Sequence, residues 1–151
     1  NVQMGLGIVL QVVRQVAHRF FPARYTGLSS NPKERERAIE VARLYEYMSR
    51  VYFYSNEKLP IVYITLRFLN EAEKAGTSPE LATAYASMAV LAGLVQLHNL
   101  AESYSEHGLS VAEQVNQPSN RITVNVVTGV HKVSVGKWEE VRVRARAKES
   151  E

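Results

Sequence analysis

The chain has 151 residues, enough for one domain or a short array of repeats with a buried core. Its composition, 46% hydrophobic and 22% charged, is ordinary for a folded globular protein and excludes an intrinsically disordered one. The lack of cysteine excludes disulfides, thiolate zinc sites and cysteine nucleophiles, and a net charge of +3 is too small to indicate nucleic-acid binding.

Two expectations concern the origin of the chain. It begins with Asn1 rather than methionine and ends in a charged, helical-looking tail, so we expect a fragment of a longer protein. A chain without cysteine fits a reducing compartment, and we therefore expect it in the cytoplasm.

The first predicted element is a helix within residues 1–30, which ends in a loop. Its apolar residues follow a 4-3-4-3-4 spacing, which puts them on one helix face. They are Val2, Leu6, Val9, Val13, Val16 and Phe20. We interpret this face as a packing surface. A membrane contact is the weaker alternative, because Gln3, Gln11 and Arg14 interrupt the run before the roughly 18–20 residues that a span needs.

The second predicted helix begins at Asn31 and Pro32. Asparagine caps a helix well, and proline is favoured in the first turn, where its missing N–H leaves no bond unmade. This helix is expected to run to about residue 54. One stripe of it carries Ala38, Val41, Ala42, Tyr45, Met48 and Tyr52.

Three more helices are predicted between residues 56 and 118. Asn56 is the expected cap of the third, which carries Pro60 in its first turn and stops at Gly76. Ser78 followed by Pro79 repeats the start signal for a fourth helix to about residue 95. A fifth covers about 97–115. Residues 31–118 should therefore form two helical hairpins.

Residues 119–151 are expected to form a third, divergent hairpin. Valines alternate with polar residues within 122–135, and such a period of two indicates strands. A lone small hairpin of strands would have little to pair with beside five helices. We favour helix, and the strand alternative stays open for 122–135.

An internal repeat links the last two hairpins. Ala89, Gln96 and Ala101 have the same spacings, 7 and 5, as Gly129, Gly136 and Val141. Small residues at such positions let paired helices approach closely, as in tetratricopeptide hairpins. The expected repeat-packing residues are Ala89, Ala101, Gly108, Gly129, Gly136 and Trp138. In the first unit Thr65 is aligned with Ala101, and the helices there are bulkier.

Several segments resemble one family. They are 42–48, 51–60 and 69–81, followed by 128–130 and 135–140, with 16–22 resembling the junction that leads into them. Together they resemble the tetratricopeptide-like region after the P-loop ATPase module of large bacterial signalling proteins with adenylate/guanylate cyclase or kinase domains. The resemblance implies a scaffold without catalytic residues, since the cyclase and phosphate-binding motifs of that family lie in other domains.

The candidate binding site is aromatic. Tyrosines crowd the first hairpin, and most are expected in its core. Tyr47, Tyr54 and Tyr63 are the candidates for a concave groove that binds a peptide or a neighbouring domain, as extended repeat surfaces do.

Catalytic and metal sites are weaker alternatives. His98 and Glu102 share a helix face, but His107 lies about half a turn away, so three ligands do not converge. Gly5 and Gly7 form a lone GxG without the context of a phosphate loop. We predict no cofactor and no metal.

The sequence therefore predicts an all-α array of about seven helices in a tetratricopeptide-like, right-handed superhelix. The predicted function is a non-catalytic scaffold that contacts protein, either a neighbouring domain or a separate peptide, in a signalling protein. Homo-oligomers are possible partners, whereas nucleic acid and membrane are not expected. The alternatives are a stand-alone peptide-binding adaptor and a small helical enzyme that uses His98 and Glu102.

Overall fold

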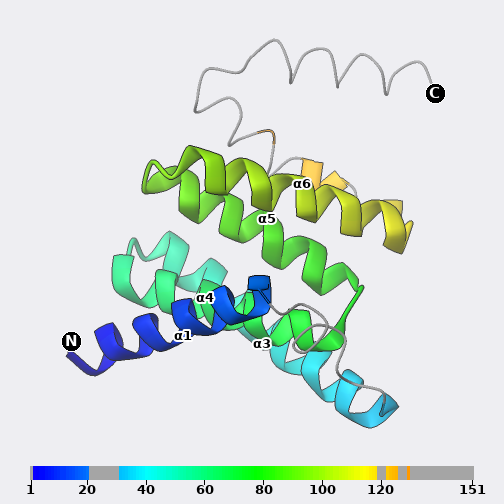
Figure 1. Cartoon of the computed structure of the whole chain (residues 1–151), viewed down its shortest axis with the longest axis horizontal. Helices are drawn as coiled ribbons and strands as arrows, with labels where there is room; N and C mark the ends of the chain where they lie inside the picture. The colour runs from blue at the N-terminus through cyan, green and yellow to red at the C-terminus, as the bar shows by residue number, and fades with distance from the viewer. Residues whose placement is uncertain (1, 21–30, 119–121, 126–128, 130–151) are drawn as a thin grey trace.

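The computed structural model describes residues 2–20, 31–118, 122–125 and 129 (Figure 1). Within these ranges the chain is helical and contains no strand, which confirms the all-α prediction there. The helices are α1 (Val2–Phe20), α3 (Pro32–Tyr54), α4 (Lys58–Ala75), α5 (Pro79–Leu94) and α6 (His98–Val115). The predicted total of about seven helices depends partly on residues outside these ranges.

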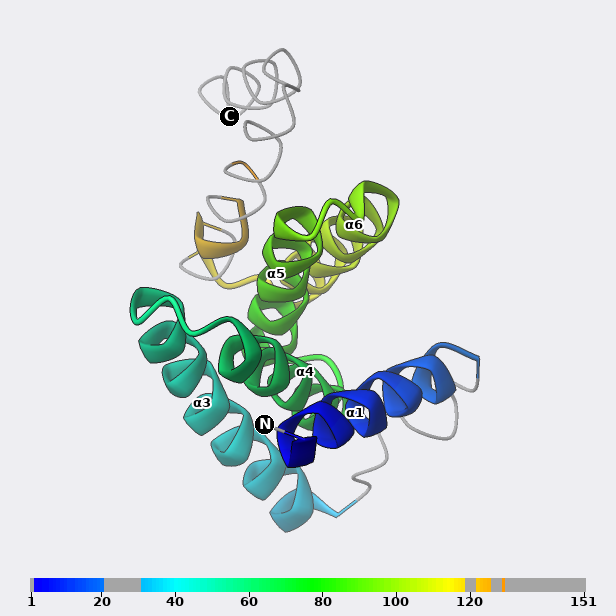
Figure 2. The same cartoon turned by 90° about the vertical axis from the view of Figure 1, so that its left-hand side faces the viewer.

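The helices pack as two hairpins with α1 at one side. α3 packs on α4, α5 packs on α6, and the hairpins meet through α4 and α5 (Figures 1 and 2). α1 packs on α4, so that α4 lies between α1 and α3 in Figure 2. The central position of α4 explains why most of its second half is buried.

Local capping fixes two of the helix starts, as the sequence predicts. The Asn31 side chain accepts a hydrogen bond from the backbone N–H of Lys33 at 3.1 Å, and Ser78 Oγ accepts one from Leu81 at 3.1 Å. Each cap is followed by proline at the start of its helix. The predicted cap at Asn56 is wrong, because Glu57 precedes α4 and makes no side-chain cap bond.

Asn56 instead belongs to a turn that recurs 40 residues later. Asn56 and Gln96 both adopt a left-handed backbone, with φ of 55° and 62°. The next N–H in each turn bonds back five residues, from Glu57 to Tyr52 at 3.2 Å and from Leu97 to Ala92 at 2.9 Å. This matched geometry relates the two hairpins. It makes residue 61, rather than Thr65, equivalent to Ala101, which corrects the sequence alignment.

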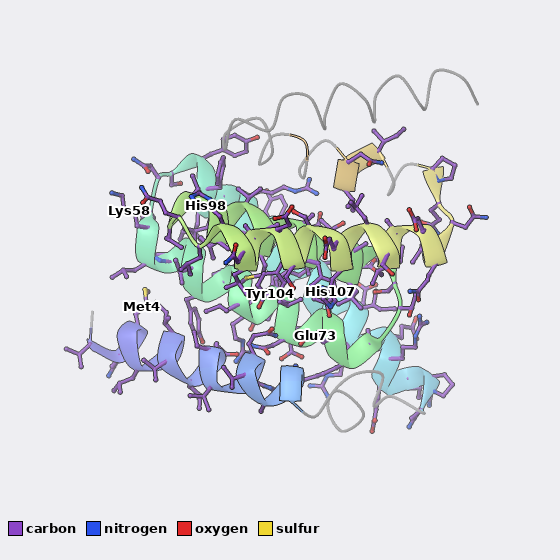
Figure 3. All side chains as sticks on the ribbon, turned by 45° about the horizontal axis from the view of Figure 1, so that its top comes forward. Met4, Lys58, Glu73, His98, Tyr104 and His107 are labelled. Atoms are coloured by element: carbon purple, nitrogen blue, oxygen red, sulfur yellow. The ribbon has the colours of Figure 1, made fainter. Side chains whose placement is uncertain are left out.

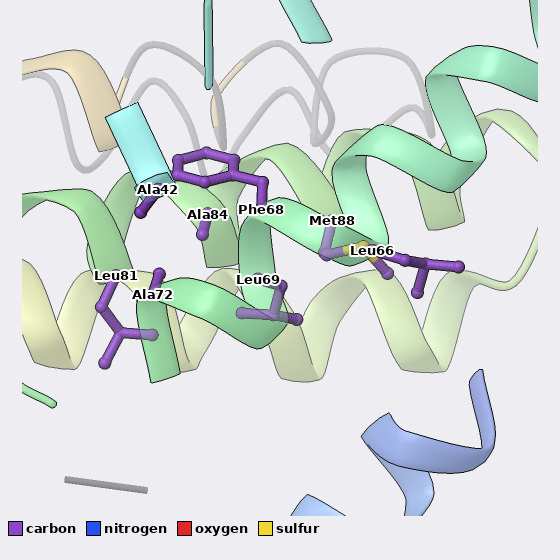
Figure 4. Close-up of a cluster of buried hydrophobic side chains, with 8 residues drawn as sticks. All are labelled: Ala42, Leu66, Phe68, Leu69, Ala72, Leu81, Ala84 and Met88. Carbon is purple, nitrogen blue, oxygen red and sulfur yellow. The ribbon is translucent and has the colours of Figure 1, made fainter. Parts of the chain in front are cut away.

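The main core lies where α4 meets α3 and α5 (Figure 4). Phe68 and Leu69 are completely buried at its centre. Their neighbours in the cluster are Ala42, Leu66, Ala72, Leu81, Ala84 and Met88. Small residues from α3 and α5 surround the large side chains of α4, so truncating Phe68 to alanine would cost about 3–5 kcal/mol.

Arginines of α3 tie this core together at its edge. Arg35 donates hydrogen bonds to the carbonyl oxygens of Ala75 and Thr77, both at 3.1 Å, and so satisfies acceptors at the end of α4. Arg43 donates to Glu80 of α5 at 2.8 Å. The hydrogen bond and charge of Glu80 raise the pKa of Arg43, which stays protonated.

A second, smaller core joins α5 and α6 to residues 122–125. Val124 is completely buried against Ala82, Ala86 and Ala112. Residues 122–125 are helical, so the strand alternative is wrong for these four residues. The rest of the 122–135 segment lies outside the described residues, apart from the helical Gly129.

Candidate functional site

The inner face of α1 is polar, contrary to the sequence interpretation. The apolar residues expected to pack, from Val2 through Val16, are 49–79% exposed. Gln11 and His18 are buried instead, on the face that lies on α4. The reason is the polar character of α4 at this contact. Valines packed over its buried Asn70 and Glu73 would leave those groups without hydrogen bonds.

Hydrogen bonds across the α1–α4 contact converge on Glu73. Gln15 Nε2 donates to Glu73 Oε2 at 2.8 Å and to Asn70 Oδ1 at 2.9 Å. His18 Nδ1 shares a hydrogen bond with the same Glu73 oxygen. Asn70 Nδ2 donates in turn to Gln11 Oε1 at 2.8 Å. The seam between two helices is thus closed by paired polar groups.

The same carboxylate reaches the second hairpin. Tyr85 of α5 donates its hydroxyl to Glu73 Oε1 at 3.2 Å, and Tyr104 of α6 donates to Gln15 at 3.5 Å. The rings of Tyr85 and Tyr104 stack with centroids 6.1 Å apart (Figure 3 labels Glu73 and Tyr104). We call these seven residues the Glu73 network: Gln11, Gln15, His18, Asn70, Glu73, Tyr85 and Tyr104.

The Glu73 network is suited to holding helices together. Glu73 and His18 are only 4% and 3% exposed, which leaves little access for a substrate. The two carboxylate oxygens already meet Gln15, His18 and Tyr85. A carboxylate that is buried and satisfied in this way fixes geometry instead of exchanging protons with a ligand.

Sequence reasoning missed this network, although a signal was present. Gln11, Gln15 and His18 follow the 4-3 spacing of one helix face, and Asn70 and Glu73 are three residues apart. Two matching polar rows on an otherwise apolar pair of helices indicate a polar contact. Only the tertiary structure shows that the two rows face each other.

The predicted aromatic groove residues divide between two places. Tyr47 and Tyr54 are 68% and 85% exposed on α3. Tyr63 is half-buried, and its ring lies so close to Gly7 that an added Cβ there would be 3.0 Å from it. Tyr63 therefore belongs to the contact between α1 and α4, and Tyr47 and Tyr54 belong to the outer surface.

Leu44 and Val51 extend the exposed pair into a continuous apolar row. Positions 44, 47, 51 and 54 follow the 3-4-3 spacing of one helix face, and all four side chains are exposed. We call them the α3 stripe. On the other side of the helix, Tyr45 is covered by Arg67, whose guanidinium lies 5.2 Å from its ring centre and donates to its hydroxyl at 2.8 Å.

The predicted repeat-packing residues lie mainly between α5 and α6. Ala89 and Ala101 are completely buried. Gly108 is also buried, and a Cβ added to it would lie 3.2 Å from the Ala82 carbonyl oxygen. Gly129 has open space around it. Gly136 and Trp138 lie outside the described residues.

His98, Glu102 and His107 do not form one site. His98 is exposed at the beginning of α6, whereas the His107 ring lies 5.5 Å from Tyr85 (Figure 3). His107 Nδ1 contacts the Ser103 carbonyl oxygen at 2.6 Å. In the part of the chain that the structure describes, no group of three or more histidine, cysteine or acidic side chains is arranged to hold a metal.

Hydropathy and comparison add two further findings. Among the described helices, none combines the length and apolar character needed to cross a bilayer. Comparison of the chain with family models, curated proteins and solved structures finds no match. Its function must therefore be argued from its own surfaces.

Proposed function

We propose that this chain is a non-catalytic helical-repeat scaffold that binds protein through the α3 stripe. In this proposal the hairpins follow a tetratricopeptide-like, right-handed superhelix. The partner is a neighbouring domain of a bacterial cyclase-type or kinase-type signalling protein in the cytoplasm, or a peptide of another protein. The α3 stripe is the observation that carries the proposal.

The composition of the stripe favours protein binding. Exposed apolar rows are unusual on a surface that has no partner. Two of its four members are tyrosines, which are enriched at the energetic centres of protein interfaces. Charged residues flank it, since Arg43 pairs with Glu40 and Arg50 pairs with Glu46 on the same helix. An apolar centre with a charged rim is typical of contacts that form and dissociate.

The repeated turn supports the scaffold part of the proposal. Asn56 and Gln96 take the same left-handed conformation 40 residues apart, and Gly136 follows Gln96 at the same interval. Glycine is the residue best suited to that conformation. A regular succession of hairpins produces the extended surfaces on which repeat proteins bind peptides. The alternative, a stand-alone adaptor, would use the same stripe.

Peptide display followed by affinity measurement tests this function. Peptides of random sequence are selected on the wild-type chain, and their affinities are then measured for the variant Tyr47→Ala/Tyr54→Ala. We expect a loss of at least about tenfold, because losing buried tyrosine contacts at an interface costs more than about 1.4 kcal/mol.

The matched control is Leu94→Ala/Leu97→Ala. Both leucines are exposed at the α5–α6 turn, away from the stripe. Their replacement should leave peptide affinity within about twofold. Selected peptides that bind the tyrosine variant as tightly as the wild type would contradict the proposed site.

A further inference from the structure

The outer face of α1 carries a helix-pairing pattern that nothing in the described structure covers. We define the α1 seam as Val2, Leu6, Val9, Val13 and Val16, all at least 49% exposed. A repeat of alternating four and three residues averages 3.5 residues, which is the period of coiled-coil seams and not the 3.6 of an isolated helix. The flanking Leu10 and Val12 are exposed as well, at 65% and 44%.

We propose that the α1 seam pairs, in antiparallel orientation, with the α1 seam of a second copy of this chain. The seam lies on a different helix from the α3 stripe, so this inference is independent of the proposed function. The sequence spacing is self-complementary. Read backwards, 4-3-4-3-4 is the same spacing, and a reversed copy matches every position along the seam.

Charge along α1 favours a copy of itself over a charged partner. Residues 2–13 contain no charged side chain, so the face offers no ion pair to an acidic or basic surface. Gly5 lies within this stretch, and an added Cβ there would have nothing within 4 Å. A neutral face with a small residue at its edge permits close approach of a second helix, and identical faces form closed two-fold contacts.

Charge also selects the antiparallel orientation. The basic residues of α1, Arg14, His18 and Arg19, all lie in its second half. Parallel pairing would bring the basic ends of two copies together, whereas antiparallel pairing sets each beside the neutral half of the other helix. The two helix dipoles then also oppose each other favourably. In this register Val9 faces Val13 of the second copy, and Leu6 faces its Val16.

The first test is the mass of the whole 151-residue chain by light scattering during gel filtration. One chain has a mass of 17.0 kDa, so we expect twice that mass at about 100 µM, a concentration suited to a small interface. The variant Val9→Asp/Val13→Asp should have the mass of one chain. The control Leu94→Asp, at an exposed site on the other hairpin, should keep the doubled mass. A wild-type monomer, a larger oligomer, or a doubled mass in the seam variant would overturn the proposal.

Disulfide trapping tests the orientation without disturbing the fold, because the chain has no native cysteine. The variants Val9→Cys and Val13→Cys are oxidised separately and as a mixture. We expect crosslinked dimer in the mixture, with each variant alone crosslinking at least about tenfold less, since a disulfide requires Cα atoms within about 7 Å. Efficient crosslinking of each variant alone, with none gained on mixing, would indicate parallel helices and overturn the antiparallel arrangement.

Discussion

Glu73 is the residue at which three helices meet. Its carboxylate accepts from Gln15 of α1 and from Tyr85 of α5, and it shares a hydrogen bond with His18, while its own backbone belongs to α4. Removing a buried acceptor leaves its donors without partners, and that loss exceeds the net value of the bonds themselves. The side chain therefore determines how α1 sits on the hairpins.

Replacing Glu73 should destabilise the fold strongly. We expect Glu73→Ala to lower the free energy of unfolding by about 3 kcal/mol, because three donors lose their acceptor in a buried site. Glu73→Gln keeps the shape and one acceptor oxygen, so about 1–2 kcal/mol is expected. Urea unfolding followed by circular dichroism measures both.

Glu113→Ala is the control for this comparison. Glu113 is exposed on α6, and its replacement should change stability by less than about 0.5 kcal/mol. Equal stabilities of the Glu73→Ala and Glu113→Ala variants would show that the network contributes nothing to the fold.

Gln96 is strained in a way that sequence alone does not show. Its φ of 62° is left-handed, a conformation that costs most side chains about 1–2 kcal/mol and glycine nothing. We therefore expect Gln96→Gly to raise the midpoint of thermal unfolding, with a gain of up to about 1 kcal/mol. Asn56→Gly in the equivalent turn should gain less, because asparagine tolerates this conformation. A lower midpoint for Gln96→Gly would argue against the turn geometry.

At the scale of elements, signals carried by neighbouring residues were predictable. The starts of α3 and α5 follow from Asn31 and Ser78, each with proline next to it, because capping requires only a few adjacent residues. Asn56 was misassigned as a cap because asparagine serves both helix starts and left-handed turns. The choice between those roles depends on the whole turn between α3 and α4.

The orientation of α1 could not be predicted by the same means. A periodic apolar pattern shows that a helix has an apolar face, but it does not show what covers that face. In this chain the covered face is the polar one, since Gln15 and His18 pair with Asn70 and Glu73 from a helix more than fifty residues away. The candidate site divided for a similar reason, because α1 covers Tyr63 and leaves Tyr47 exposed.

The contact between α5 and α6 depends on the absence of a side chain at Gly108. A Cβ there would approach the backbone of α5, 3.2 Å from the Ala82 oxygen and 3.4 Å from the Ala86 nitrogen. Backbone atoms cannot swing aside, so Gly108→Ala should cost about 1–3 kcal/mol despite the better helix propensity of alanine. Chemical unfolding of dilute protein measures this cost.

Gly5→Ala provides the comparison within a helix. The space around Gly5 is open, so alanine should stabilise α1 by about 0.5–1 kcal/mol through propensity alone. Equal effects of the two substitutions would show that α5 and α6 do not approach closely at Gly108.

At the scale of the whole molecule, two apolar faces point away from the core. α1 and α3 both pack on α4, on either side of it in Figure 2, and each turns apolar residues outward as the α1 seam and the α3 stripe. The interior is already closed by the Phe68 cluster and the Glu73 network, so neither face is needed to complete the fold. Faces of this kind are available for contacts with other chains, which is the central claim of the scaffold proposal.

The most direct test of that claim is to measure stability and binding on one variant, Tyr47→Ala/Tyr54→Ala. If the α3 stripe serves binding, its unfolding free energy in urea stays within about 0.5 kcal/mol of wild type, while affinity for the selected peptides falls at least about tenfold. A loss of several kcal/mol in stability, or an unchanged affinity, would contradict the account.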